Sequence, residues 1–227
     1  MGRILKDFIS LFFPRTCLGC KKILISSESH ICLHCRLTLP VSNAHLEKRN
    51  PLKRRLSSIS HLKQAYSFMH YNKGGIAQKL LKKLKYEDNE EIGELLGLWM
   101  GNEIRRAVNE IDIIIPVPLH DKKLRIRGYN QSDSISKGLS EALNVPWNRD
   151  LIIRTKHNAT QTKKSKTDRW LNVELLFEAN EANDIVGKHV LLVDDVITTG
   201  ATIESMAEVV INAGAKSISV ACIASGQ

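Results

Sequence analysis

The sequence predicts an α/β domain with a parallel β-sheet, preceded by a small metal-binding module. After residue 62, apolar runs typical of buried strands alternate with segments that repeat apolar residues at helical spacing. One such run, Val190–Val193, ends in two aspartates and a Thr- and Gly-rich loop. Near the beginning, four cysteines form two C-x2-C pairs. Because ligands bind beyond the carboxyl ends of parallel strands, the loop after Val193 is the first candidate for a site.

The order of the expected elements divides the chain into three parts. Residues 1–45 should hold an amphipathic helix and a zinc ribbon, residues 46–61 a basic linker, and residues 62–227 the main domain. Hydrophobic periodicity and the Gly and Pro breaks predict strands near 65–71, 111–117, 151–154, 190–193 and 216–224, and helices near 76–86, 89–108, 132–143 and 201–213.

The first segment, residues 3–13, places Ile4, Phe8 and Phe12 on one face of a helix. We expect this helix to pack onto the neighbouring domain; docking to a partner or to a membrane surface is the alternative. No apolar run reaches the roughly 18 to 20 residues that a membrane-spanning helix needs. Asp7 interrupts the apolar start and no small-residue cleavage site follows, so we expect a cytoplasmic protein without a transmembrane segment.

Positive charge is concentrated in the first third of the chain. The formal net charge of the protein is +9. Residues 1–86 contain 17 Lys and Arg against 3 Asp and Glu, whereas residues 87–227 contain 16 against 21. This asymmetry favours a polyanionic partner such as nucleic acid, and surface solubility is the simpler interpretation.

Cys17, Cys20, Cys32 and Cys35 are expected to bind one zinc ion. A C-x2-C turn brings two thiolates to one metal, and two such turns complete a tetrahedron without an open position, so the zinc would be structural. Disulfides and a redox C-x2-C are the competing interpretations. The lack of a secretory signal argues against disulfides. The presence of the Cys32/Cys35 pair argues against a redox motif, which needs only one C-x2-C. Cys222 lies in a strand pattern and is expected to be a buried apolar side chain.

The segment from Val190 to Thr202 carries the main functional signal. A buried strand ends at Asp194 and Asp195, and a loop with Gly200 leads into a helix. The backbone N–H groups of such a loop and the helix N-terminus can bind a phosphate. Two carboxylates beside a phosphate need another function, such as accepting hydrogen bonds from vicinal ribose hydroxyls or holding hydrated Mg²⁺. The alternative is a turn whose Asp and Thr residues only cap the helix.

This segment resembles the motif with which type I phosphoribosyltransferases bind phosphoribosyl pyrophosphate (PRPP). The resemblance implies a type I phosphoribosyltransferase-like sheet with flanking helices. It also implies that Asp194 and Asp195 bind the ribose hydroxyls of PRPP, with Mg²⁺ bound alongside. The loop that would bind the 5′-phosphate consists of Val196, Ile197, Thr198, Thr199, Gly200, Ala201 and Thr202.

The resemblance extends to the ComF family of competence-associated proteins and covers nearly the whole chain. Members of that family share an N-terminal four-cysteine ribbon. The other matching segments are Pro116-Val-Pro-Leu-His120, Leu124–Gln131, Thr160-Gln-Thr162 with Arg169 and Asn172-Val173, and the basic stretch Lys82–Tyr86. The resemblance implies a role in DNA uptake and processing, with single-stranded DNA as a ligand.

Phosphoribosyl transfer would place negative charge on the leaving pyrophosphate, which basic side chains must stabilise together with Mg²⁺. The candidates are, in order, Arg125 and Arg127, then Lys82 and Lys85, then Lys163, Lys164 and Arg169. Arg127 is preferred because it is expected in a loop that Gly128 lets close over the ligand. Asp194, Asp195 and Arg127 are therefore the expected catalytic residues. A solvated or nucleic-acid-facing charge is the alternative for each basic group.

Three functions are compatible with these features. The protein could be an enzyme that transfers phosphoribosyl to an unidentified acceptor, a sensor that binds PRPP and single-stranded DNA, or a scaffold that docks a helicase-like competence protein. Aromatic side chains interleaved with the basic residues favour strand binding, because basic grooves with stacking rings suit single strands. These aromatics are Phe12, Phe13, Tyr66, Tyr71 and Tyr86, for which packing in the core is the alternative.

Overall fold

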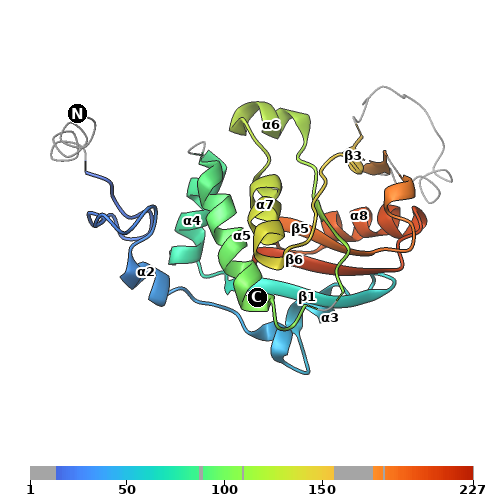
Figure 1. Ribbon diagram of the computed structural model, residues 1–227, viewed down its shortest axis with the longest axis horizontal. Coiled ribbons are helices and arrows are strands. Elements are labelled where there is room, and N and C mark those ends of the chain that lie inside the picture. The colour runs from blue at the N-terminus through green and yellow to red at the C-terminus, as the bar shows by residue number, and fades with distance from the viewer. Residues whose placement is uncertain (1–13, 87–88, 109, 156–175, 181, 227) are drawn as a thin grey trace, which may run out of the picture.

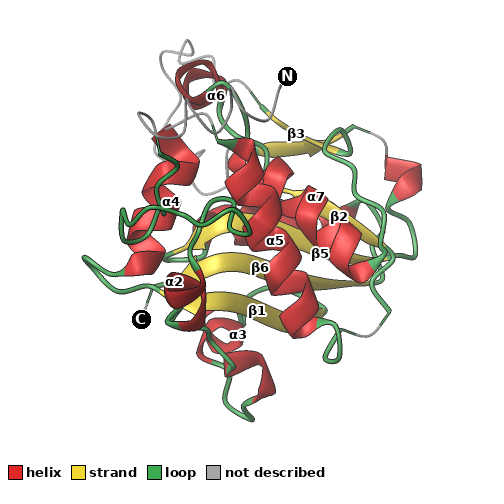
Figure 2. Ribbon diagram, turned by 60° about the vertical axis from the view of Figure 1, so that its left-hand side comes forward, coloured by secondary structure: helices red, strands yellow, loops and turns green. Residues whose placement is uncertain are grey.

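A four-stranded parallel sheet forms the centre of the protein (Figure 2). The computed structural model describes residues 14–86, 89–108, 110–155, 176–180 and 182–226. The strands lie in the order β1-β6-β5-β2. Their bounds are Leu62–His70 for β1, Ile113–Pro116 for β2, His189–Ile197 for β5 and Ser217–Ser225 for β6. The predicted parallel sheet is confirmed.

Helices cover both faces of this sheet. One face packs against α4 (Ile76–Tyr86), α5 (Glu90–Ile104) and α7 (Gln131–Leu143), which Figure 2 shows in front of the strands. The other face packs against α3 (Pro51–Arg55) and α8 (Ala201–Asn212). Alternate residues of β6 belong to the two resulting cores: Val220 and Cys222 to one, Ala221 and Ile223 to the other.

Helices α5 and α7 approach each other closely because glycines lie between them. Gly93, Gly97 and Gly101 occur at every fourth position of α5. A Cβ atom on Gly97 would lie 2.2 Å from the carbonyl oxygen of Ile135, so any side chain there would force the helices apart. This packing fixes the position of α7, whose first turn reaches the candidate site.

A second, two-stranded sheet lies outside the main one. The strand expected at 151–154 is β3 (Ile152–Arg154), which pairs antiparallel with β4 (Phe177–Ala179). The sequence did not indicate β4, because three residues are too few to show an alternating pattern. Phe177 is fully buried and anchors this small sheet to the core that contains α8.

The cysteine segment packs onto the main domain and shares its core. Leu24 and Ile31 belong to the same apolar cluster as the buried residues of α4 and α5. The Nε2 atom of His30 lies 3.0 Å from a carboxylate oxygen of Glu91. From α2 (Leu33–Leu37), the guanidinium of Arg36 stacks over Trp99 at 4.7 Å from the ring centre. The segment is therefore held by apolar contacts to α4 and α5 and by polar and cation–π contacts to α5.

Residues 46–61, expected as a basic linker, contain the short helix α3. The Oδ1 atom of Asn50 accepts hydrogen bonds from the backbone N–H groups of Leu52 and Lys53, at 3.0 and 3.1 Å. Leu52 and Leu56 are buried. An Asn N-cap followed by Pro51 is a helix-start signal. It explains why a helix forms in a segment whose polar composition suggested a linker. A 3-10 turn, η1 (Ala44–Leu46), precedes it, and η3 (Ala182–Asp184) precedes β5.

Several expectations fall on residues outside the described part of the chain. They concern the helix at 3–13 and the candidates Lys163, Lys164 and Arg169. Among the helices that are described, none has the length and hydrophobicity to cross a lipid bilayer.

Candidate functional site

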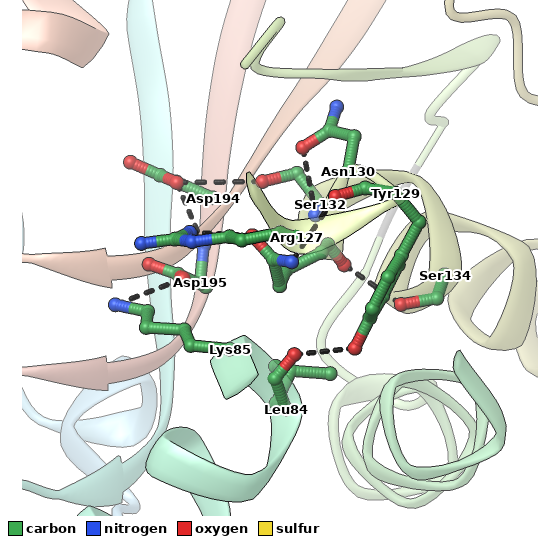
Figure 3. A network of polar contacts seen from close by, with 10 residues as sticks. Leu84, Lys85, Arg127, Tyr129, Asn130, Ser132, Ser134, Asp194 and Asp195 are labelled. Carbon is green, nitrogen blue, oxygen red and sulfur yellow. Dashed lines mark hydrogen bonds and ion pairs between the residues drawn. The ribbon is translucent and has the colours of Figure 1, made fainter. Parts of the chain in front are cut away.

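Asp194 and Asp195 lie at the carboxyl edge of the sheet, where polar groups from two helices reach them (Figure 3). Pairing of β5 with β6 continues to Ile197, so the acids lie within the last part of the strand and not after it. The backbone N–H of Asp195 donates to Oδ1 of Asp194 at 2.8 Å. The hydroxyl of Ser132, in the first turn of α7, donates to the same oxygen at 3.4 Å.

The two acids differ in their surroundings. Burial raises the pKa of Asp194 to about 7, and the charge of Asp195 acts in the same direction. The Asp195 N–H, Lys85 and Ser132 oppose this shift without cancelling it. Near neutral pH, Asp194 therefore changes between a protonated and an ionised form, and only the ionised carboxylate accepts hydrogen bonds at both oxygens.

Lys85, from the end of α4, is the cation closest to the acid pair in the described chain. Its Nζ lies 3.0 Å from Oδ2 of Asp195, and the two side chains are 24% and 13% exposed. The hydroxyl of Tyr129 donates to the carbonyl oxygen of Leu84, which ties the end of α4 to the segment before α7. Lys82, the other candidate on α4, is exposed and makes no salt bridge among the described residues.

Thr198, Thr199 and Gly200 form the turn between β5 and α8. Gly200 has a φ of 100°, and a Cβ atom there would lie 2.7 Å from a methyl carbon of Leu56. Both the backbone conformation and the space therefore require glycine. Thr198 and Thr199 are exposed, and the first N–H groups of α8 lack intrahelical acceptors. The turn can thus offer hydroxyl and N–H donors to an anion.

Arg125 and Arg127 lie on a helix and not in the loop that was expected. This helix, α6 (Asp121–Arg127), begins at His120, whose Nδ1 accepts a backbone hydrogen bond at 3.1 Å. It ends at Gly128, with a φ of 78°. None of its residues is buried, and Figure 1 shows it projecting from the body of the protein. A helix without a buried face gives no amphipathic pattern, which explains the wrong prediction.

Arg127 reaches back from α6 toward the site. Its Nη1 donates to Oε1 of Gln131 at 2.6 Å, and its guanidinium lies 5.8 Å from the ring centre of Tyr86. Gln131 is 1% exposed and donates to the carbonyl oxygen of Tyr129, so it holds Arg127 in place. Arg125 is exposed to solvent.

Arg154, at the end of β3, is a basic residue close enough to Asp194 for the two charges to interact, and the sequence prediction missed it. It lines a cavity of about 650 Å³ together with the loop after β2 and the first turn of α7. Its Nη1 donates to the carbonyl oxygen of Pro118 at 3.4 Å, and its guanidinium lies 5.3 Å from the ring centre of Phe177. Burial lowers the pKa of Arg154, while the charge of Asp194 opposes that shift. A lone Arg that ends a three-residue strand gave no signal.

A second arginine of the same cavity is already paired. Nη1 of Arg149 lies 3.1 Å from Oδ2 of Asp133. Burial raises the pKa of Asp133, and Arg149 counteracts this effect. Asn130 donates to the other carboxylate oxygen of Asp133 at 2.6 Å. In the cavity wall, the charge of Arg149 is therefore neutralised by Asp133. Arg154, in contrast, has a carbonyl oxygen as its described hydrogen-bond partner.

The four cysteines of the C-x2-C pairs form one cluster. Their Sγ atoms lie within 4.8 Å of one another, and those of Cys20 and Cys32 are 3.7 Å apart. Zinc–sulfur bonds of about 2.3 Å give tetrahedral edges of about 3.8 Å. A disulfide needs about 2.05 Å between sulfurs, and all five cysteines of the chain are free. The cluster could therefore hold a metal ion such as zinc.

The aromatic residues proposed for stacking on bases occupy different environments. Tyr66 is 3% exposed and its hydroxyl donates to the carbonyl oxygen of Ala107 at 3.2 Å, so it is a core residue. Tyr86 is 70% exposed on α4. Phe12 and Phe13 lie outside the described residues.

Comparison with known proteins agrees with this geometry. The model of the phosphoribosyl transferase domain matches residues 129–227, which contain the acids and the turn that follows them. Competence protein F of Haemophilus influenzae is 30% identical over 213 residues, which cover 90% of this chain and 87% of that protein. The chain belongs to the ComF family. Competence protein ComFC of Bacillus subtilis is 27% identical over 88% of this chain and 79% of that protein.

Other similar proteins match a smaller part of this chain. The DNA utilization protein YhgH of Escherichia coli O157:H7 is 33% identical over 63% of this chain, and the matched region spans 65% of that relative. Among solved structures, glutamine PRPP amidotransferase of B. subtilis has a TM-score of 0.42 at 22% identity and covers 58% of this chain and 26% of that one. The parallel sheet and the cysteine cluster confirm the predicted fold class on their own.

Proposed function

We propose that this protein binds PRPP at the carboxyl edge of its sheet and supports phosphoribosyl chemistry there. The observation that carries the proposal is the half-buried acid pair at the end of β5, followed by the Thr198–Gly200 turn at the start of α8. Asp194 and Asp195 would accept hydrogen bonds from the ribose hydroxyls. The segment Val196–Thr202 would bind the 5′-phosphate through backbone and threonine donors.

Transfer would break the bond between ribose C1 and pyrophosphate and form a bond from C1 to the acceptor. Pyrophosphate would leave with the bonding electrons, and the acceptor would lose its proton to solvent. Bound Mg²⁺ would supply charge neutralisation for the diphosphate. Arg127 and Arg154 would stabilise the negative charge on the leaving group, and Lys85 would exchange its contact with Asp195 for one with the ligand.

Isothermal titration of PRPP, with and without Mg²⁺, tests this site. We expect Mg²⁺-enhanced binding to the wild type and its loss in the Asp194→Asn/Asp195→Asn variant. The substitutions keep the size of the side chains, so thermal unfolding should show that the variant is folded. If folded wild-type protein does not bind PRPP, the proposal is wrong. If PRPP binds, release of pyrophosphate in the presence of candidate acceptors separates an enzyme from a sensor.

We also propose a competence-related function in which the protein associates with single-stranded DNA, and we propose zinc as the metal of the cysteine cluster. The supporting observations are the names of the family members, which refer to competence and to DNA utilization, and the positive charge of the first third. A helicase-like partner, docked through the N-terminal segment and the cysteine ribbon (residues 1–45), is the remaining part of this proposal. Metal analysis of the purified protein tests for zinc.

A further inference from the structure

Four cations converge on one groove at residues 47–64, in the segment expected to be a linker. The groove has a volume of about 750 Å³. Its basic residues are Lys48, Arg49, Lys53 and Arg54, and Glu47 is the one acid among its lining residues. All four cations are exposed. We call this surface the basic groove; none of its lining residues belongs to the proposed PRPP site.

The floor of the basic groove is a fixed hydrogen-bonded structure. Asn50 is 6% exposed, caps α3 and donates from Nδ2 to the carbonyl oxygen of Ala65 at 2.6 Å. The Nε2 atom of Gln64 donates to the carbonyl oxygen of His45 at 3.1 Å. These bonds attach α3 and the residues before it to β1. The four basic side chains therefore extend from a fixed backbone. Binding a ligand then costs less backbone entropy than it would if this segment were a flexible linker.

Across the part of the chain that the structure describes, the cations of the basic groove have no acidic partners. Within the described residues, none of the four makes a salt bridge, whereas Lys85, Lys137 and Arg149 elsewhere are each paired with a carboxylate. Four unpaired positive charges on one small surface repel one another. A chain of phosphates would relieve this repulsion, because it presents negative charges at regular short intervals.

We propose that the basic groove binds the phosphodiester backbone of a nucleic acid strand. This inference rests on the proposed association with DNA and assigns its location and its mode. No Phe, Tyr or Trp lines the groove, so bases would not be stacked there. Tyr86, the exposed tyrosine on α4, is not among the groove's lining residues. The groove would therefore bind through charge, with little dependence on the bases.

This mode predicts a defined dependence on salt. If four phosphates of a single strand are neutralised, the slope of log Kobs against log salt should be about −3. Each single substitution of a groove cation by Gln should make the slope less negative by about 0.7. An abasic strand should bind within about twofold of an oligothymidylate strand, since backbone contacts carry no base information.

The test is fluorescence anisotropy with labelled oligothymidylate and abasic strands of about 20 nucleotides, between about 50 and 200 mM salt. The full-length protein is compared with Lys48→Gln/Arg49→Gln/Lys53→Gln/Arg54→Gln. The matched control is Lys122→Gln/Lys123→Gln on α6, which removes two exposed charges outside the groove and is compared with the groove double variant Lys53→Gln/Arg54→Gln. PRPP titration of the same proteins shows that the variants are folded and that the two sites are independent.

We expect the groove variant to lose affinity and most of the salt slope, and the control to keep both. The inference is wrong if the control loses as much as the groove variant, because total charge would then govern binding. It is also wrong if the abasic strand binds far more weakly, or if the groove variant loses binding to phosphatidylserine vesicles but not to strands. If the wild type binds no strand, the proposed DNA association fails as well.

Discussion

Asp194 is held in an environment that disfavours its charged form. Its folded-state pKa of about 7 lies well above its ordinary value of 3.8, because of burial and the adjacent Asp195. Functional sites commonly contain such shifted groups, since a carboxylate poised near neutral pH responds to a bound ligand or cation. This unfavourable environment lowers the stability of the folded protein.

The Asp194→Asn variant should be more stable than the wild type at pH 8. Between pH 4 and pH 7 the unfolded carboxyl is ionised while the folded one keeps its proton, so wild-type stability falls as pH rises through this window. Asn does not titrate, so the difference should be about 4 kcal/mol at pH 8 and fall below about 1 kcal/mol near pH 4. Urea unfolding across this pH range measures it. A constant difference at every pH would contradict the assignment.

Arg154 should contribute to binding of the diphosphate and not of the ribose phosphate. Arg154→Gln removes a half-buried guanidinium that lines the cavity and, within the described residues, has no carboxylate partner. We expect binding of Mg²⁺-pyrophosphate to weaken about tenfold, since a charge-assisted hydrogen bond contributes about 1.5 to 3 kcal/mol. Ribose 5-phosphate should bind unchanged, and Arg154→Lys should restore part of the loss. Calorimetry measures all three.

Arg149→Gln is the matched control for this experiment, because Arg149 lines the same cavity but is paired with Asp133. It should leave pyrophosphate affinity within about twofold of the wild type. Equal losses in the two variants would assign the effect to the general charge of the cavity. Equal losses of pyrophosphate and ribose 5-phosphate would indicate that Arg154 only supports the structure.

At the scale of elements, α4 joins the cysteine segment to the acid pair. At its first residue, Ile76, it contacts Gly19 in the first C-x2-C turn: a Cβ atom on Gly19 would lie 2.9 Å from the Ile76 side chain. At its other end, Lys85 contacts Asp195 and the Leu84 carbonyl oxygen accepts from Tyr129. A helix transmits displacement along its axis, so the cysteine cluster, with the zinc proposed for it, and the acid pair should be coupled.

Removal of the metal by a chelator should therefore weaken PRPP binding several-fold. The same treatment should have a smaller effect in the Lys85→Ala variant, which lacks the contact between α4 and Asp195. Thiol titration checks that the metal has left: the half-buried Cys20 should become reactive, while Cys222 stays unreactive because burial raises its pKa to about 12. Equal effects of chelation in the wild type and in Lys85→Ala would exclude coupling through the contact between Lys85 and Asp195.

At the scale of the whole molecule, the sequence predicted what depends on local patterns. The parallel sheet follows from apolar runs, the cysteine cluster from its spacing, and the acids from their position after such a run. It did not predict Arg154 at the site, α3, or the close contact of α5 with α7. These features depend on which surfaces meet after folding, and a basic or glycine-rich segment alone does not specify its partner.

The position of β6 also determines when the sheet can be completed. β6 lies between β1 and β5, and Val220 is paired with both Ala65 and Leu192. As the chain leaves the ribosome, β1 emerges early but its hydrogen-bonding neighbour emerges last among the strands. Until then one edge of β1 has no partner strand, and contacts so distant in sequence form slowly. Until β6 has been synthesised, newly made chains should thus depend on the cysteine segment and α3 to cover β1.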